Sequence, residues 1–407
     1  MKENYRSSIH YFLKENKVYD CLPKNSQVIV VDRQFSVYET IELIIKNDYE
    51  ESIIWNSDQS KFDGIITYTD IAQIILQFYK EVTTNGKAFL QRKGSFQQEI
   101  EMEGIDEDQL MHSNSMQKSG SEPVFQKNFT IREKSLFNNA FEFPFIPSQH
   151  SEPFIFQLKN YSIRQWFRYL SNEESDSKDL ITTSLESILQ DVSQKMNQKN
   201  VHRVIVVDKD SDLVVGVLNY RDILLFLIRN LTKDIDDQSN SSNEYDLPIS
   251  YLTRSFSKLF PKLFSVKINE STYKAFHAMI HDYQVSSIPV VDEYNKYKGI
   301  IYKRDIRFIW RTKNFQILGK PVSEFLEFIA IEKQKYKSTS LGTPTDFQLS
   351  ETVRQVVEKC MLAPGNRLIC VDQDSGQIIQ FITLTDIFKY YLRPHLEDQQ
   401  QTMQASI

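Results

Sequence analysis

The chain has 407 residues, 41% hydrophobic and 25% charged, so it is long enough for two or three domains with sizeable cores. Its formal net charge of −6 argues against a general nucleic-acid-binding protein, because neutralising phosphates requires an excess of Lys and Arg on one face. Three scattered cysteines, Cys21, Cys360 and Cys370, argue against a disulfide framework or a CxxC metal site and fit a reducing compartment. The N-terminal segment has no apolar run of signal-peptide length, and the longest apolar stretch, 223–228, is far short of a bilayer span. These features predict a soluble intracellular protein.

One short pattern occurs four times along the chain. Each copy has an apolar strand, then Thr, Asn or Tyr three positions before an aspartate, then an apolar helix. The copies begin at Gly64, Gly216, Gly299 and Gln380, and their aspartates are Asp70, Asp222, Asp305 and Asp386. The last three aspartates are 83 residues (222 to 305) and 81 residues (305 to 386) apart, whereas the first gap is 152 residues (70 to 222). A step of about 80 residues indicates an internal repeat, with a long insert between copies one and two.

A predicted amphipathic helix and a β-rich run precede each aspartate. In chain order, the apolar helix faces contain Val37, Ile41, Ile44 and Ile45; Leu185, Ile188, Leu189, Val192 and Met196; Phe276, Met279, Ile280 and Tyr283; and Val353, Val356, Val357 and Cys360. The β-rich runs are SIIW from Ser52, VIVVD from Val204, IPVVD from Ile288 and LICVD from Leu368. The order helix, strand, turn, strand, helix predicts a three-layer α/β packing. Because a unit of about 55–60 residues is near the lower limit for an independent core, we expect the units to pair.

The predicted domain organisation follows these copies. Repeat 1 occupies 1–83, a low-complexity insert 84–150, a preceding helix and repeat 2 151–233, a linker 234–246, repeat 3 247–315, repeat 4 316–394 and a tail 395–407. The insert is rich in Gln, Ser, Lys and Glu, a composition that cannot offset the entropy of ordering, so we expect it to be mobile. Within it, Ser95 follows Arg92-Lys93-Gly94 and resembles a kinase substrate site, with an ordinary polar loop serine as the alternative.

The repeated unit, which ends in G-h-h-T-x-x-D (h is apolar), resembles the cystathionine-β-synthase (CBS) domain. Four copies as two tandem pairs resemble the gamma regulatory subunits of AMP-activated protein kinase. The closest matches are VYDCLPKNSQVIVVD from Val18 and IIWNSDQSKFDGIITYTD from Ile53, and IRQWFRYL from Ile163 resembles the helix before the family's second copy. The resemblance covers nearly the whole chain except the insert and the tail. It implies an α/β fold of four CBS (helix-strand-strand-helix) repeats in two tandem pairs forming a flat disc, whose central sites bind AMP, ADP or ATP.

The repeated aspartate has the hydrogen-bonding chemistry that binding a nucleotide requires. One carboxylate can accept hydrogen bonds from both hydroxyls of a ribose, and phosphates favour a helix N-terminus supplied with Arg or Lys. The resemblance implies that the aspartate holds the ribose while basic residues face the phosphates. The alternative is that each aspartate only caps its helix.

Two nucleotide sites are predicted to be the best supplied with positive charge. The first combines Asp386, Thr383 and Thr385 with His202, Arg203, Asn366 and Arg367, where Asn366 replaces the family's usual His. The second combines Asp305 and Lys303 with Arg203 and Arg221, and Tyr302 narrows it.

Two further positions are expected to be weak or empty. The first contains Asp70, Thr67 and Thr69, and there Glu50 replaces the family's phosphate-binding Arg and would repel a phosphate. The second contains Asp222, for which repeat 3 offers Gln284 rather than a clear Arg.

The sequence contains few motifs that are typical of an enzyme. The chain has no GxxxxGK[ST] loop and no GxGxxG, and no Ser-His-Asp or Cys-His set can be assembled from local motifs. His277 and His281 are four residues apart but lack the glutamate of the zinc-peptidase motif, so a half-exposed helix face is the favoured interpretation.

The sequence therefore predicts a non-catalytic regulatory subunit of a protein kinase complex, which binds AMP, ADP or ATP and senses energy charge. No cofactor, metal, nucleic acid or membrane insertion is expected, and the protein partners would be the kinase catalytic and scaffold subunits. The alternatives are a structural or scaffold CBS protein in a larger assembly with degenerate sites and, more remotely, a module that gates a transporter. The expected location is the cytoplasm, with the nucleus or a cytoskeletal or ciliary assembly as alternatives.

Overall fold

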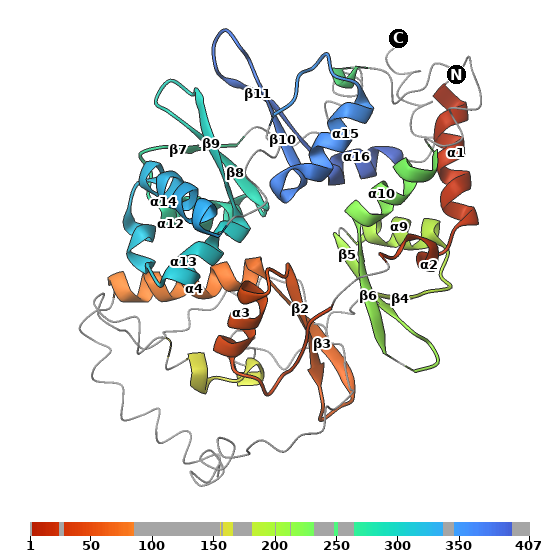
Figure 1. Cartoon of the computed structure of the whole chain (residues 1–407), viewed down its shortest axis with the longest axis horizontal. Coiled ribbons are helices and arrows are strands. Elements are labelled where there is room, and N and C mark those ends of the chain that lie inside the picture. Colours follow the sequence, from red (N-terminus) through yellow and green to blue (C-terminus); the bar gives the residue numbers. More distant parts are fainter. Residues whose placement is uncertain are drawn as a thin grey trace. The chain divides into compact units, whose positions relative to one another are not determined.

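A computed structural model describes residues 2–23, 28–84, 155, 158–165, 181–199, 201–211, 213–231, 248–250, 264–336 and 346–392 (Figure 1). The chain divides into two compact units: one is Met1–Val28, Lys178–Phe308 and Gly319–Ile407, and the other is Ile29–Ser177 and Ile309–Leu318. The predicted insert beyond Thr84, the linker, the tail and Ser95 lie outside the described residues. None of the helices in the described ranges is long and apolar enough to cross a bilayer.

The same α/β arrangement occurs four times, as Figure 1 shows. Repeat 1 contains β1 Val30–Asp32, α3 Val37–Lys46, β2 Glu51–Asn56, β3 Lys61–Thr67 and α4 Tyr68–Thr84. Repeat 2 contains β4 Thr182–Ser184, α9 Leu189–Gln198, β5 Arg203–Val207, β6 Val214–Asn219 and α10 Tyr220–Leu231. Repeat 3 contains β7 Val266–Lys267, α12 Thr272–His277, β8 Ser287–Val291, β9 Tyr297–Tyr302 and α13 Ile306–Thr312. Repeat 4 contains α15 Val353–Leu362, β10 Arg367–Val371, β11 Ile378–Thr383 and α16 Leu384–Tyr391. The predicted mixed α/β repeat is thus confirmed.

A short strand before the first helix was missing from the predicted order. In repeats 1 to 3 this strand pairs in parallel with the next one, and the two later strands pair antiparallel. In repeat 4 a single parallel bridge between Asp346 and Ile369 takes its place. Two or three residues are too few to show the alternation by which a strand is recognised in a sequence.

Two of the predicted helix faces are confirmed in full. Val37, Ile41, Ile44 and Ile45 are buried on α3, and Val353, Val356, Val357 and Cys360 are buried on α15. Both helices begin at a hydroxyl N-cap, since Ser36 accepts from the backbone N–H of Glu39 and Thr352 from that of Gln355. These caps satisfy amide groups that the helix itself leaves without partners.

The other two helix faces were predicted wrongly at one end. Helix α9 begins only at Leu189, so Leu185 and Ile188 precede it, and Ile188 is 42% exposed. In repeat 3 the residues after α12 form a π-helical turn, Ala278–Asp282. The wider turn ends the regular spacing, and Tyr283 is 45% exposed instead of buried.

Two hydrophobic clusters connect the repeats of the first unit. The larger one joins repeats 2 and 4 with the N-terminal helices α1 Lys2–Glu15 and α2 Val18–Cys21. At its centre the rings of Tyr220 and Phe388 lie 4.4 Å apart. The smaller cluster joins the sheets of repeats 3 and 4 through Ile300, Tyr302, Ile369 and Phe381.

Each repeat also holds the segment that leads into a neighbouring repeat. Backbone bridges join Lys17, before repeat 1, to Ile188 in repeat 2, and Ser162, before repeat 2, to Ser36 in repeat 1. In the same way, Pro248 joins Thr352 of repeat 4 and Pro321 joins Ser271 of repeat 3. The leading segments are thus exchanged between repeats 1 and 2 and between repeats 3 and 4, which is the connectivity expected of two tandem pairs. Their assembly into a disc stays a prediction.

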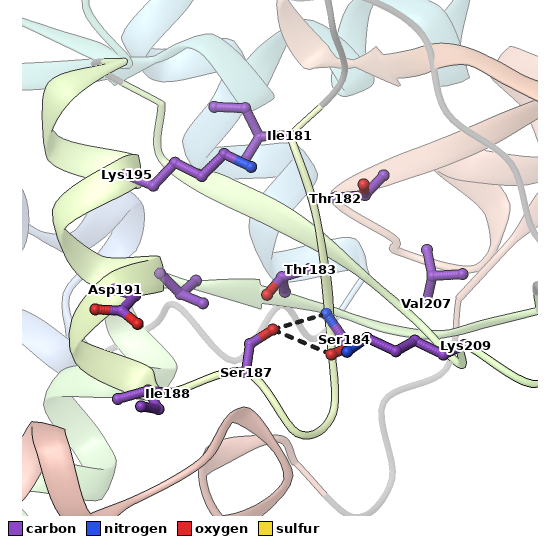
Figure 2. A pocket seen from close by; sticks show the side chains of 11 residues that line it. Ile181, Thr182, Thr183, Ser184, Ser187, Ile188, Asp191, Lys195, Val207 and Lys209 are labelled. Atoms are coloured by element: carbon purple, nitrogen blue, oxygen red, sulfur yellow. Dashed lines mark hydrogen bonds between the residues drawn. The ribbon is translucent and has the colours of Figure 1, made fainter.

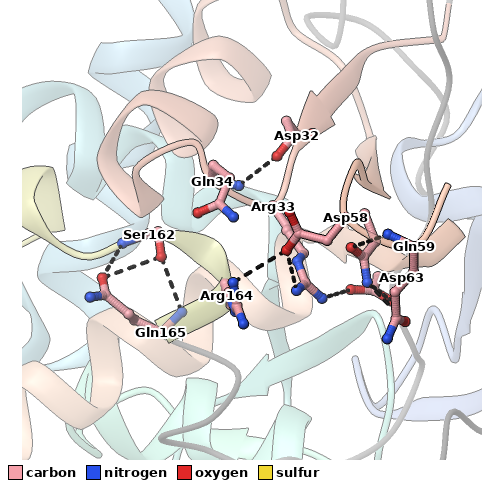
Figure 3. A network of polar contacts seen from close by, with 10 residues as sticks. Asp32, Arg33, Gln34, Asp58, Gln59, Asp63, Ser162, Arg164 and Gln165 are labelled. Carbon is pink, nitrogen blue, oxygen red and sulfur yellow. Dashed lines mark hydrogen bonds and ion pairs between the residues drawn. The ribbon is translucent and has the colours of Figure 1, made fainter. Parts of the chain in front are cut away.

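A polar network at repeat 1 shows how one exchanged segment is held (Figure 3). The guanidinium of Arg33 lies 2.8 Å from Asp58 and 3.0 Å from Asp63, and Arg164 of the exchanged segment reaches Asp58 at 3.2 Å. The backbone N–H of Arg164 donates to the carbonyl of Arg33, and that of Ile163 donates to the carbonyl of Phe35. Exposed ion pairs contribute at most about 1 kcal/mol each, so the backbone hydrogen bonds and buried Ile163 fix the register.

Candidate functional site

Each repeated aspartate accepts a hydrogen bond from the backbone N–H three residues earlier. Asp70, Asp222 and Asp386 lie in the first turn of their second helix, whereas Asp305 ends a 3-10 turn, Lys303–Asp305, directly before α13. The pairs are Thr67 to Asp70 at 2.7 Å, Asn219 to Asp222 at 3.2 Å, Tyr302 to Asp305 at 2.9 Å and Thr383 to Asp386 at 2.9 Å. The hydroxyls of Thr67 and Thr383 donate to the same carboxylates, and Thr69 donates its N–H to Thr67. Helix capping is therefore one function of all four aspartates, and it explains the Thr or Asn three positions earlier.

The aspartates differ in the second carboxylate oxygen, which capping does not use. At Asp305 this oxygen lies 3.3 Å from the Nζ of Lys333. At Asp386 all the hydrogen bonds to the carboxylate reach Oδ2, so within the described ranges Oδ1 accepts none. Burial raises the pKa of Asp386, against the lowering effect of Thr383, Arg367 and Lys389. Asp386 thus keeps an acceptor for a ligand donor.

Three repeats bring polar and basic side chains together near Asp386. The hydroxyl of Thr385 lies 3.4 Å from Nδ1 of His202, whose ring packs edge-on against Tyr220 with centroids 5.6 Å apart. Although His202 keeps an exposed edge, surrounding protein atoms lower the pKa of its ring, and the charges of Lys389 and Lys303 lower it further. The ring of His202, when neutral, can donate or accept a hydrogen bond, while the two lysines whose charges act on it supply positive charge of the kind that a phosphate requires.

Lys389 was absent from the predicted site. It lies on α16 three residues after Asp386 and four after Thr385, so it shares their helix face. A search for basic residues one turn beyond each aspartate would have found it.

Arg367, predicted to face a phosphate, lies inside the junction between repeats 3 and 4. It is 6% exposed, and its Nη1 donates to the backbone carbonyl of Ser287 at 2.9 Å. Its guanidinium lies 5.8 Å from the ring centroids of Phe264 and of Phe381. Burial lowers the pKa of Arg367, and the nearby Asp386 opposes this effect. These contacts describe a packed cation that joins two sheets.

The remaining residues used in the predictions lie apart from one another along the chain. Arg203 begins β5 opposite Asn219, and Arg221 is exposed on α10, where its charge acts on Asp222. Asn366 has a left-handed φ of 52°, and its carbonyl accepts from the Cys360 thiol at 3.0 Å. Glu50 and Gln284, which mark the weak sites, are both exposed.

Asp222 has a strongly raised pKa. Burial raises its pKa from 3.8 to about 6, against the lowering effects of the Asn219 N–H and Arg221. Because the folded state binds this proton more tightly, the stability gained is present below about pH 4 and is lost as the pH rises towards 6.

We therefore expect Asp222→Asn to raise the thermal midpoint at pH 7.5 by a few degrees and to leave it nearly unchanged at pH 4. Scanning calorimetry at both pH values measures this. Asp374→Asn, on an exposed turn, is the matched control and should change neither midpoint. An equal shift at both pH values would contradict the assignment.

An open pocket of about 490 Å³ lies elsewhere, beside the sheet of repeat 2 (Figure 2). Figure 2 shows Ile188, Asp191 and Lys195 on the α9 side and Thr182 and Thr183 on the opposite side. No predicted site residue lines it. This pocket is therefore separate from the predicted nucleotide-binding residues.

His277 and His281 have ring centroids 4.6 Å apart, and Nδ1 of His277 lies 3.9 Å from Asp282. Over the described ranges no group of three or more His, Cys, Asp or Glu side chains could hold a metal ion.

Comparison with known proteins agrees with this architecture. Residues 19–77, 176–229 and 258–310 match the CBS domain family, and these segments cover the strands of repeats 1 to 3 and the larger part of their helices. The gamma subunit of 5'-AMP-activated protein kinase from Dictyostelium discoideum is 22% identical over 388 residues, which are 94% of this chain and 52% of that protein. The corresponding subunit from Kluyveromyces lactis is 21% identical over 394 residues, covering 95% of this chain and 91% of that protein. The chain therefore spans about half the length of the first relative and most of the second.

A crystal structure shows the same fold. A protein from Methanocaldococcus jannaschii, described as a proposed archaeal homologue of the AMPK gamma subunit, superposes with a TM-score of 0.53 at 15% identity. The match covers 92% of this chain and 100% of that one. Three segments of the chain thus match the CBS domain family, and nearly its whole length is similar to the gamma regulatory subunit of AMP-activated protein kinase.

Proposed function

We propose that this chain is a non-catalytic regulatory subunit that binds an adenine nucleotide at Asp386 and transmits its occupancy to a partner kinase. The observation that carries the proposal is the contact of Thr385 with His202 directly beside Asp386, whose Oδ1 accepts no hydrogen bond within the described ranges. The charge of Lys389 acts on both Asp386 and His202, and that of Lys303 acts on His202. In this arrangement Asp386 Oδ1 would accept from a ribose hydroxyl. The two lysines would neutralise phosphate charge, and the neutral His202 would complete the hydrogen bonding.

The kinase partner is proposed from the relatives, which are named as kinase subunits. Regulation requires that AMP and ATP complexes differ in their affinity for the partner, because a ligand shifts an equilibrium only by its differential binding. Purification of the native complex followed by mass spectrometry tests this part. A kinase catalytic chain at equal stoichiometry supports it, and its consistent absence argues against it.

Calorimetric titration of the whole chain with AMP, ADP and ATP tests the site. Asp386→Ala should weaken binding about 10- to 150-fold, the loss expected for a charge-assisted hydrogen bond of 1.5–3 kcal/mol. Asp374→Ala replaces an exposed aspartate in the same repeat and should leave the Kd within about twofold. Absence of binding at millimolar nucleotide, or equal loss in both variants, would refute the proposal.

A scaffold function without nucleotide exchange is the second candidate. Two observations favour it: Asp305 already has an internal cation, and Arg367 is buried beside two aromatic rings instead of facing solvent. A wild-type chain that binds no nucleotide yet forms a stable native complex would select this function.

A further inference from the structure

The Asp305 position of repeat 3 is filled from within the chain. Asp305 is 2% exposed, and both of its carboxylate oxygens have partners: the backbone N–H of Tyr302 at 2.9 Å and the Nζ of Lys333 at 3.3 Å. Lys333 lies on α14 (Val322–Lys335), a helix between repeats 3 and 4, and its side chain is 19% exposed. The ammonium group is therefore placed where it compensates a buried charge rather than a surface one.

The ring of Tyr302 closes the space beside this ion pair. Tyr302 is 4% exposed and packs with Ile300, Ile369 and Phe381 in the core that joins repeats 3 and 4. The Nζ of Lys333 lies 5.7 Å from the ring centroid, which adds a cation–π contact.

On another side, the Tyr302 ring meets Gly365 in the turn before β10. A Cβ built on Gly365 would lie 2.9 Å from a ring carbon of Tyr302, and the residue has a φ of 68°. Only glycine fits at this distance and in this left-handed conformation. The turn that carries Asn366 and Arg367 is thus in direct contact with the ring and leaves no room between them.

We propose that Lys333 and Tyr302 act as an internal ligand of Asp305, so that the Asp305 position holds no exchangeable nucleotide. The inference rests on the proposed function for its binding part, whereas the ion pair itself can be tested without nucleotide. Removing one partner of a buried ion pair leaves an uncompensated charge, while removing both leaves a neutral site.

The first experiment uses nucleotide-free protein and thermal unfolding. Lys333→Met should lower the midpoint by about 10 °C, and Asp305→Asn combined with Lys333→Met should recover most of that loss. Lys320→Met, which removes an exposed partner of Glu324 near the start of α14, is the matched control and should change the midpoint by less than about 2 °C. If Lys333→Met behaves like Lys320→Met, or if the double variant recovers nothing, the internal ion pair is refuted.

The second experiment counts bound nucleotides by calorimetry. The wild type and Asp305→Asn should bind the same number with Kd values within about twofold, whereas Asp386→Ala should lose the site. Loss of a nucleotide in Asp305→Asn would overturn the proposal, because the carboxylate would then hold a ligand. If the wild type binds none, the proposed function fails, and closure of the Asp305 position is still decided by the thermal experiment.

Discussion

Replacing Trp310 with alanine should lower the free energy of unfolding by about 3–5 kcal/mol, the usual cost of removing a large buried aromatic side chain. Trp310 is fully buried in the second unit, where its ring lies 5.5 Å from that of Tyr38 on α3. Its Nε1 donates to Glu42 at 2.8 Å, and Lys313 both pairs with Glu42 at 3.0 Å and lies 3.8 Å from the indole centroid. One substitution therefore opens a cavity and removes a donor from a partly buried carboxylate. Urea midpoints and calorimetry measure the loss.

Two variants separate the parts of this effect. Trp310→Phe keeps most of the ring but loses the N–H donor, so it should cost about 1–2 kcal/mol. Tyr294→Ala removes an aromatic side chain that is 77% exposed and should stay within about 0.5 kcal/mol of the wild type. A cost for Trp310→Ala no larger than that of Tyr294→Ala would mean that residues 309–318 are not anchored to repeat 1 as the structure shows.

The same cluster predicts sensitivity to acid. Burial alone would raise the pKa of Glu42, but the hydrogen bond and charge of Lys313 and the hydrogen bonds of Trp310 and Tyr38 outweigh it and lower the pKa. The resulting stabilisation is present above the unfolded pKa of about 4.5 and is lost as the pH falls through the folded value. Both the packing of Trp310 and the ion pair between Glu42 and Lys313 therefore stabilise this cluster.

The repeats were predictable from the sequence because each helix and strand carries its own periodic pattern. The strand pairs β2–β3, β5–β6, β8–β9 and β10–β11 lie where the apolar runs predicted them. The failures occur where the pattern is interrupted: strands of two or three residues, the late start of α9 and the π-helical turn after α12. The exchange of leading segments could not be derived from periodicity, since it depends on tertiary contacts alone.

The site was less predictable than the fold. Sequence spacing identified Asp386, Thr385 and His202, and the structure places Thr385 3.4 Å from His202, on which the charge of Lys303 acts. It did not identify Lys333, which lies 28 residues after Asp305 on a helix outside the repeated pattern. It also gave no measure of burial, which distinguishes Arg367 in the junction from exposed Arg221. A motif fixes which residue types are near one another along the chain, whereas ligand binding depends on the contacts those side chains already make.

Arg367 allows this distinction to be tested. Arg367→Ala should lower the free energy of unfolding by about 3–5 kcal/mol, because it leaves the Ser287 carbonyl without its donor and opens a cavity beside two aromatic rings. Arg367→Met should cost less than about 1.5 kcal/mol, since an apolar chain of similar length fills the space and avoids burying a charge. Urea unfolding of both variants measures the difference.

Nucleotide titration of the folded Arg367→Met variant then decides the role of the guanidinium. A packed cation that joins repeats 3 and 4 predicts a Kd within about threefold of the wild type, whereas a direct phosphate ligand predicts a loss of 30-fold or more. Equal destabilisation by Ala and Met would show instead that the charge, through its attraction to Asp386, is needed for folding. The repeat pattern predicts Arg367 as a phosphate-binding residue, whereas the structure buries it. The titration therefore distinguishes a guanidinium that binds nucleotide from one that only holds the sheets of repeats 3 and 4 together.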